Sequence, residues 1–469
     1  MKKIILAALT VAIFVCGTLS ATAQTRHTSD ANIYGHIIDS KTKEHIPYVT
    51  ISIKGTTYGT VADASGHFFL KNLPEGKHTV VAESLTHKSS EQEVTLTKGK
   101  NIEVNFTLLE NTLSMDEVVV SATRNETNKK SSATIVNVSS IKLFENTASS
   151  NLAESIKFQP GLRVENSCGN CGAVQLRING LDGQYSQILL DSSPIFSSLA
   201  GVYGLEQLPV AMIERVEVIR GGGSALFGSN AIGGVVNIIT KEPLRNSLNL
   251  SHTSNIFDGG DTEFDTSLGG SFVSDDHRAG VYLFGMVKDR DAYDRNDDGF
   301  TDITMMKSET VGFRGYYKTS TYSKLTAEYH HISEARRGGD NINLPPHMAE
   351  IAEDVKHKID GGSLNFQYLS PNHRHSFNIH TSMQGISRDS YYGTGKDPNA
   401  YGETHDVTFV AGAQYNYKFN KCLFMPAQLT VGFEYTHNDL DDHSLSFDRS
   451  IKQEVHTGGV FIQNEWRNE

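Results

Sequence analysis

Residues 213–241 read IERVEVIRGGGSALFGSNAIGGVVNIITK, which is the most specific pattern in the chain. Apolar and polar residues alternate around Val216 and Val218, glycine dominates the middle, and residues 235–239 are mostly β-branched. This order predicts a strand, a loop and a second strand. A phosphate-binding glycine loop would have its third glycine where this chain has Leu226, so that alternative is disfavoured. The structural alternative is a close-packed turn in which glycine supplies positive φ.

Length and composition limit the classes to which the chain can belong. With 469 residues it has room for roughly two to four domains. Hydrophobic residues make up 38% of the chain, and no apolar run after the N-terminus reaches the ~18 residues of a membrane-spanning helix. A search for long apolar runs does not detect membrane-spanning strands, because polar and apolar residues alternate along them. The net charge of −12 argues against nucleic acid as a partner.

Residues 1–23 have the pattern of a secretory signal peptide. Lys2 and Lys3 precede an apolar stretch at residues 4–15, and small residues lead to a cleavage site after Ala23. The mature chain is therefore expected to fold in an oxidising compartment. It keeps three cysteines: Cys168, Cys171 and Cys422.

Further motifs precede the glycine-rich stretch, namely PGLRV at residues 160–164, LRING at 176–180 and ILLD at 188–191. Together with residues 213–241 they resemble the plug domain of TonB-dependent outer-membrane receptors, which carries PGV, IRG and LLDG motifs and closes with IERVEVIRG and GGVVNIITK. Phe227 stands where the family usually has tyrosine. The resemblance implies a mixed α/β plug over residues 130–241.

Residues 33–110 alternate in short runs separated by turn residues, which predicts a small antiparallel β-sandwich. Gly35, Asp39, GHF at 66–68 and LPEG at 73–76 resemble the carboxypeptidase-regulatory-like domain found ahead of many Bacteroidetes receptors. No metal-ligand or nucleophile pattern accompanies them. The domain is therefore not expected to be an enzyme.

Residues 115–123 form a short β-branched run next to a polar tether. Such a run is either the last strand of the preceding sandwich or an extended peptide that adds to the sheet edge of a partner. Its place before the plug resembles a TonB box, which implies coupling to periplasmic TonB. The residues predicted to couple are Asp116, Glu117, Val118, Val119, Val120, Ser121 and Ala122.

Residues 245–469 change to long alternating segments. In residues 407–419 the odd positions are apolar and several even positions are polar, so one face suits lipid and the other a polar lumen. About ten such strands, each near ten residues long, alternate between short and long connections. This predicts the first part of an antiparallel transmembrane β-barrel in the outer membrane of a Gram-negative bacterium. The fold class is therefore mainly β.

The family uses about 22 strands around its plug, so roughly half a barrel is expected to be missing. The sequence is interpreted as a fragment or an interrupted reading frame.

The resemblance implies three apical plug loops that touch the ligand, and assigns Cys168, Cys171, Gln184, Tyr185 and Phe196 to them. Cys168 and Cys171 are spaced C-x-x-C, which permits either a local disulfide or a soft-metal site. A metal would need further ligands, for which His347 and Met348 are candidates. Both alternatives stay open.

A second candidate metal site lies between two predicted strands. The spacing D-x-N-x-D-G-x-x-D sets oxygen ligands at alternate positions around a turn glycine, as a calcium loop requires. The alternative is a solvated Asp/Asn/Gly loop. The candidate ligands are Asp294, Asn296, Asp298 and Asp302.

The resemblance implies a TonB-dependent receptor that imports a metal-containing nutrient: a ferric siderophore, haem, cobalamin or a free soft metal. Its partners would be TonB, outer-membrane lipid and the metal chelate. It would need no cofactor apart from calcium in the external loop, and it would not be an enzyme. The alternative is a truncated, non-transporting remnant or a surface binding protein.

Overall fold

The computed structural model describes residues 29–40, 43–46, 49–56, 58–63, 65–84, 87, 89–109, 118–121, 124, 127–128, 134–168, 170, 172–194, 200–228, 230–258, 260–372 and 374–466. The predicted signal peptide lies outside these residues. The chain divides into an N-terminal unit, covering residues up to 54 and 58–110, and a second unit that holds the rest. No helix among the described residues is long and apolar enough to cross a membrane.

The N-terminal unit is built from two four-stranded sheets around one apolar core. Its strands are β1 (Ala31–Asp39), β2 (Thr50–Ile53), β3 (Gly59–Val61), β4 (His67–Leu73), β5 (Gly76–Glu83), β6 (Ser90–Leu96), β7 (Asn101–Glu103) and β8 (Phe106–Leu108). The sheets have the orders β4-β1-β7, with β8 also on β1, and β3-β2-β5-β6.

One detail of the sandwich prediction was wrong, because β1 pairs in parallel with both β7 and β8. The chain bends between these two short strands, and the carbonyl of Val104 closes tightly over Gly35. A Cβ on Gly35 would lie 1.9 Å from that oxygen, so only glycine fits there. The alternation of residue types in the sequence carries no information about strand direction.

The plug contains the predicted strand–loop–strand. β15 (Ile213–Arg220) and β16 (Gly234–Thr240) pair antiparallel in a sheet of order β11-β15-β16-β14. Gly221 has φ of +100°, and a Cβ on Gly234 would lie 2.3 Å from the oxygen of Ile219. The glycines therefore serve backbone geometry, as the close-packed-turn interpretation requires. The remaining strands of this sheet are β11 (Val136–Ser140) and β14 (Ser186–Leu190).

Helices and a hairpin complete the plug. α3 (Leu152–Ile156) begins at Asn151, whose side chain accepts from the amide of Glu154 at 3.0 Å. The Glu154 carboxylate accepts from the amide of Ser150 at 2.8 Å, so the predicted capping box is present with its return bond one residue earlier. The other elements are α2 (Ile141–Asn146), α4 (Ala200–Gln207), α5 (Ser224–Phe227), the 3₁₀ turns η1 (Gly183–Tyr185) and η2 (Val210–Met212), and the hairpin of β12 (Leu162–Cys168) and β13 (Ala173–Ile178).

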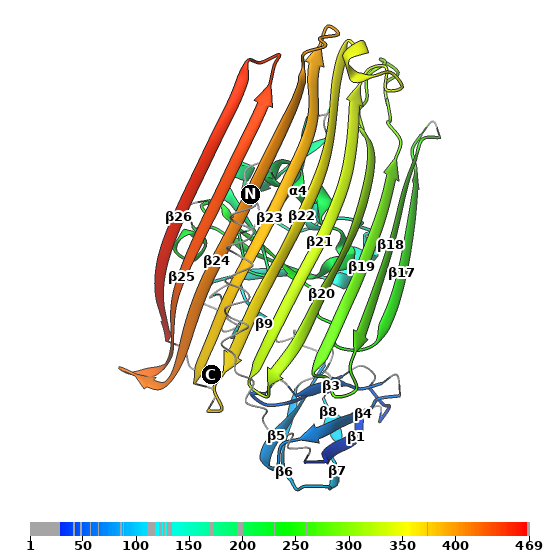
Figure 1. The fold of residues 1–469 in the computed structure, drawn as a ribbon. Helices are drawn as coiled ribbons and strands as arrows, with labels where there is room; N and C mark the ends of the chain where they lie inside the picture. Colours follow the sequence, from blue (N-terminus) through cyan, green and yellow to red (C-terminus); the bar gives the residue numbers. More distant parts are fainter. Residues whose placement is uncertain are drawn as a thin grey trace. The chain divides into compact units, whose positions relative to one another are not determined.

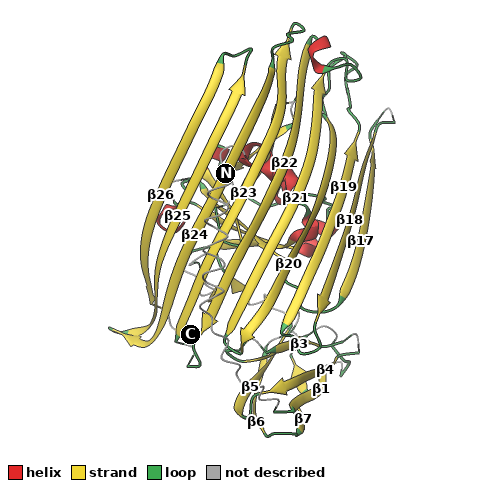
Figure 2. Cartoon of the chain, viewed as in Figure 1, coloured by secondary structure: helices red, strands yellow, loops and turns green. Residues whose placement is uncertain are grey.

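Ten antiparallel strands follow in sequential order, which confirms the predicted number and type (Figure 1). The plug lies on one face of this curved sheet (Figure 2). Tyr282 and Phe284 of the sheet belong to the buried core of the plug. The strands are β17 (Ser247–Ile256), β18 (Thr262–Val273), β19 (Ala279–Arg290), β20 (Met305–Ser320), β21 (Ser323–Gly339), β22 (Ile351–Leu369), β23 (His375–Thr394), β24 (Tyr401–Cys422), β25 (Met425–Ser444) and β26 (Arg449–Trp466).

The prediction that every strand has about ten residues was wrong, because β24 has 22. Short connections occur where expected. Two connections that the sequence predicts to be long, at residues 391–403 and 439–452, cover only residues 395–400 and 445–448. Backbone pairing continues beyond the stretch in which hydropathy alternates, since ladder hydrogen bonds do not need an apolar side chain. The hydropathy pattern therefore locates the apolar band of the sheet, but it underestimates the length of the strands.

Candidate functional site

Part of the predicted TonB box lies against the plug. β9 (Val118–Val119) pairs antiparallel with β10 (Thr127–Asn128). Val119 is fully buried in an apolar cluster of the plug. The other predicted coupling residues Asp116, Glu117 and Ala122 lie outside the described residues. The buried members of the cluster are Val119, Val136, Leu189, Ile219, Phe227, Ala231 and Val235.

One carboxylate holds the end of this segment. The amides of Val120 and Ser121 donate to the same oxygen of Glu217 at 2.9 and 2.8 Å, and the Ser121 hydroxyl donates to it at 2.7 Å. Glu217 is completely buried, and its second oxygen accepts from Arg215 Nε at 2.9 Å. A buried carboxylate depends strongly on such donors. Glu217 therefore ties the segment to the central strands of the plug sheet.

Arg124, three residues further on, ties the same segment to the ten-stranded sheet. Its Nη1 donates to Glu434 Oε2 at 2.9 Å, and its backbone oxygen accepts from Gln414 Nε2 at 3.1 Å. The guanidinium also lies 4.8 Å from the ring centroid of Phe227 and 4.9 Å from that of Phe461. Residues 120–121 are thus fixed at the plug, and Arg124 is fixed at both the plug and the sheet.

Ion pairs dominate the remaining boundary between plug and sheet. Arg336 of β21 is 1% exposed and bonds three groups: Glu334 on its own strand at 2.8 Å, Glu206 of α4, and the oxygen of Gly172 at 3.0 Å. Similar contacts follow the sheet. Lys288 and Arg314 of the sheet pair with Glu154 (3.3 Å) and Asp191 (2.5 Å) of the plug. Lys324 of the sheet pairs with Glu242, in the segment that connects the plug to the first strand of the sheet (2.9 Å).

The predicted apical loop that carries the C-x-x-C motif is the tip of the β12–β13 hairpin. Cys168 Sγ lies 3.4 Å from Glu353 Oε2 on β22. A Cβ on Gly338 would lie 1.8 Å from the oxygen of Asn170, so the tip presses on the sheet. Cys171 lies outside the described residues, and the choice between disulfide and metal stays open. His347 donates to or accepts from the hydroxyl of Tyr401 at 2.8 Å.

The other predicted ligand residues are only partly described. Tyr185 ends η1 and is 39% exposed, while the side chain of Gln184 and all of Phe196 lie outside the description. An open hollow of about 470 Å³ lies near the base of the β12–β13 hairpin. Among the described residues it is lined by Gly161, Leu162, Arg163, Glu165, Arg177, Asn179 and Gly180, none of which was predicted to bind ligand.

In the predicted calcium loop, several side-chain oxygens accept backbone amides. Asp294 accepts from Gly299 at 2.8 Å, Asp298 from Phe300 at 2.9 Å and Asp302 from Arg295 at 2.9 Å. These bonds form the turn of a solvated Asp/Asn/Gly loop without any ion. Asp294 Oδ1, however, is buried and has no hydrogen-bond partner.

Three residues of the site were not predicted from the sequence: Glu217, Arg124 and Glu434. Glu217 could have been suspected, because it shares a strand face with Ile219 and lies directly between two valines, Val216 and Val218. Arg124 and Glu434 are 310 residues apart, so no local pattern indicates their contact.

Two domains of the chain match known protein families. Residues 33–120 match the model of the CarboxypepD_reg-like domain, and residues 128–235 match the TonB-dependent Receptor Plug Domain. The vitamin B12 transporter BtuB of Vibrio vulnificus is 26% identical over 75% of this chain and 55% of its own length. The BtuB of Vibrio cholerae is 32% identical over 27% of this chain and 21% of its own. The chain thus spans about half the length of the first of these relatives.

Solved structures share the fold. The ferric enterobactin receptor PfeA of Pseudomonas aeruginosa superposes with a TM-score of 0.60 at 19% identity, over 71% of this chain and 55% of that one. The siderophore receptor PirA of Acinetobacter baumannii gives a TM-score of 0.60 at 18% identity, over 72% and 55%. The plug match and the shared fold agree: residues 128–235 form a TonB-dependent receptor plug domain, and the fold is that of the solved receptors.

Proposed function

We propose that this chain works in TonB-dependent import of a metal-containing nutrient across the outer membrane of a Gram-negative bacterium. The observation that carries the proposal is the attachment of Val120 and Ser121 to Glu217. These residues follow the unit that ends at residue 110 and directly precede the plug. The N-terminal domain supports a receptor of the Bacteroidetes type, and the polar inner and apolar outer faces of the strands support a place in lipid.

The attachment indicates how a pull would reach the plug. TonB would capture residues 116–122 as an added strand, in which backbone hydrogen bonds provide most of the affinity. Tension on this segment reaches Glu217 first, and Glu217 belongs to β15, which has β11 on one side and β16 on the other. The load is therefore applied to the middle of the plug sheet, while the Arg124–Glu434 pair must separate for the segment to leave the sheet.

The relatives support a cargo that contains metal. BtuB is named for vitamin B12, and PfeA for ferric enterobactin. We propose a ferric siderophore, haem, cobalamin or a soft metal ion, contacted by Cys168, Cys171, Gln184, Tyr185 and Phe196. The Cys168 thiol beside Glu353 offers a sulfur and an oxygen donor to such a cargo. Import breaks no bond in the cargo, so the proposed role is not enzymatic.

We also propose calcium for the loop at residues 294–302. The buried Asp294 Oδ1 without a partner fits a cation ligand, and carbonyl and carboxylate oxygens are the ligands that calcium prefers. Asp298→Ala should then raise protease cleavage of this loop only when calcium is present. Equal cleavage with and without a chelator would remove calcium from the account.

Uptake in cells tests the function. Val119→Pro removes a backbone donor from the coupling segment and should abolish accumulation of cobalamin or ferric enterobactin, whichever the cells take up through this protein, while surface binding stays. Val119→Ala is the matched control and should import at near the normal rate. Normal accumulation by Val119→Pro, or accumulation that persists without TonB, would contradict TonB-dependent import. Surface binding without accumulation by the unchanged chain would favour a surface binding protein. Cys168→Ser and Cys171→Ser then separate a thiolate contact from a purely structural loop.

A further inference from the structure

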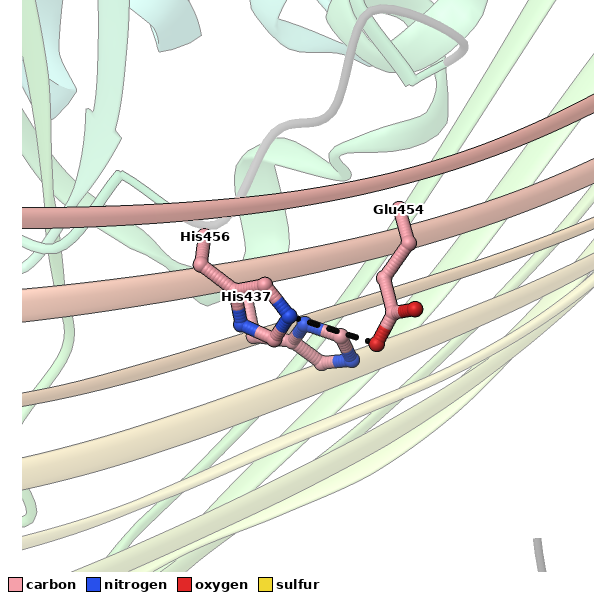
Figure 3. Close-up of side chains that lie close together, drawn as sticks. All are labelled: His437, Glu454 and His456. Atoms are coloured by element: carbon pink, nitrogen blue, oxygen red, sulfur yellow. Dashed lines mark ion pairs between the residues drawn. The ribbon is translucent and has the colours of Figure 1, made fainter.

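Three metal-ligating side chains meet on the face of the sheet opposite the plug. They are His437 of β25 and Glu454 and His456 of β26 (Figure 3). One ligand atom from each lies within 4.8 Å of the others, and the described residues contain no second group of three His, Cys, Asp or Glu with this property. We propose that these three side chains bind a divalent transition-metal ion of the zinc type.

Strand geometry brings the three together. Glu454 and His456 are two residues apart on β26, so their side chains leave the same face. The register of the two strands sets His437 directly opposite His456. Their rings stack with centroids 4.5 Å apart. The site therefore joins neighbouring strands at one height and depends on that register.

The hydrogen bonds leave suitable nitrogen atoms available. His456 Nδ1 lies 2.7 Å from the hydroxyl of Tyr435, which can accept a hydrogen bond from Nδ1–H and so leave the lone pair on Nε2. That Nε2 lies 3.2 Å from Glu454 Oε1. His437 Nδ1 is buried and has no hydrogen-bond partner. An unpartnered buried nitrogen is costly, and a metal bond would satisfy it.

The distances between the three ligand atoms would suit zinc after a small rotation of the side chains. Zinc binds histidine at ~2.0–2.1 Å, so two ligand atoms of a tetrahedral site lie roughly 3.3–3.5 Å apart. The His456–Glu454 pair, at 3.2 Å, is already close to this separation. The exposed Glu454 and His456 side chains can rotate to bring the third atom in. Two histidines and one carboxylate form a donor set known for zinc, with a fourth position left to water.

The location separates this site from the cargo path. His437 follows Val431, Phe433 and Tyr435 along the outward-facing positions of β25, while Glu434 points inward to Arg124. Beyond His437 the outward positions become acidic, at Asp439 and Asp441. The ion would link β25 to β26 where the apolar outer face ends, and this inference does not rest on the proposed import function.

Zinc binding by the purified full chain in detergent tests the site, with zinc ion as the probe and a chromogenic chelator as competitor. The unchanged chain should hold one ion per chain, and His437→Ala should lower its affinity by at least ~30-fold. Tyr435→Phe should lower it by about 10-fold, because it removes the hydrogen bond that orients His456. Cobalt in place of zinc should give a tetrahedral visible spectrum that the His437→Ala variant lacks.

His405→Ala is the matched control. His405 Nε2 lies 2.9 Å from Glu403 Oε1 on β24, in the same Glu-x-His arrangement, but among the described residues no third ligand atom lies within 4.8 Å of both. Its zinc affinity should equal that of the unchanged chain. Unchanged affinity in His437→Ala, or an equal loss in His405→Ala, would overturn the proposal. All these side chains lie at the surface of the sheet, so circular dichroism should show the same strand content in each variant.

Discussion

The core of the plug and the boundary of the plug are held by different forces. Inside the plug, Leu152, Ile156 and Val216 are fully buried among apolar neighbours. At the boundary, cations of the sheet reach acidic groups of the plug, with Tyr282 and Phe284 as an apolar exception. When an ion pair at the boundary separates, water hydrates both charges and offsets the lost attraction. Exposing apolar surface of the core to water has no such compensation and costs about 25 cal/mol per Å². The plug can therefore shift against the sheet at lower cost than it can unfold.

The largest expected effect comes from Arg336→Met. This variant leaves Glu334 and Glu206 buried without their cation, which should lower the free energy of unfolding by about 3–5 kcal/mol. Denaturant titration of the detergent-solubilised chain measures it. Lys307→Met is the control, because Lys307 pairs with Asp289 on an exposed surface and should cost less than ~1 kcal/mol. Equal losses in both variants would mean that the boundary is not held by buried charge.

Leu152→Ala tests the other side of the comparison. Leu152 is completely buried at the start of α3, so the lost contacts and the remaining cavity should cost about 2–5 kcal/mol. The loss should appear as protease cleavage within the plug, while the ten-stranded sheet stays resistant. Leu244→Ala, at a position 53% exposed, should change little. Cleavage spread evenly over plug and sheet would contradict the claim that the plug can unfold while the sheet stays folded.

Gly338→Ala disturbs the contact between hairpin tip and sheet. The added methyl group would meet the oxygen of Asn170, and such overpacking costs ~1–3 kcal/mol. A fluorophore near the hairpin tip should report a displaced tip. Gly385→Ala, on β23 with no atom within 4 Å of an added Cβ, should leave the signal unchanged. An undisturbed tip in Gly338→Ala would show that this contact is loose.

The smallest effect is a dependence on pH. Burial alone raises the pKa of Glu154, but Lys288 and the hydrogen bonds from Ser150 outweigh it and hold the pKa below its usual 4.5. The stabilisation is therefore complete above that value and is lost as pH falls through the lowered pKa. Acid titration should loosen the plug only below pH 4.5, and Glu154→Gln should remove that step. Loosening near neutral pH would exclude Glu154 as the cause.

Local patterns predicted the elements well, because each depends on neighbouring residues. The alternation in residues 213–241 and the glycines that need special backbone geometry led directly to β15 and β16. The same holds for the capping of α3 by Asn151. The ten strands followed from hydropathy, although their full lengths did not.

Contacts between distant residues could not be predicted in the same way. Ser121 meets Glu217 across 96 positions of sequence. His437 meets His456 only because the register of β25 and β26 aligns them, and a shift of one residue would turn them to opposite faces. The parallel pairing of β1 with β7 and β8 could not be predicted for a similar reason. A single sequence reports residue types along the chain, whereas these sites depend on how separate strands are aligned.

The central proposal is that TonB captures residues 116–122 and pulls on the plug through them. The most direct measurement is photo-crosslinking in cells, with a photoreactive residue in place of Val120 and, as a control, in place of Lys98 in the N-terminal domain. The account predicts a crosslink to TonB from position 120 and none from position 98. Absence of the product at position 120, or equal yields at both positions, would contradict it.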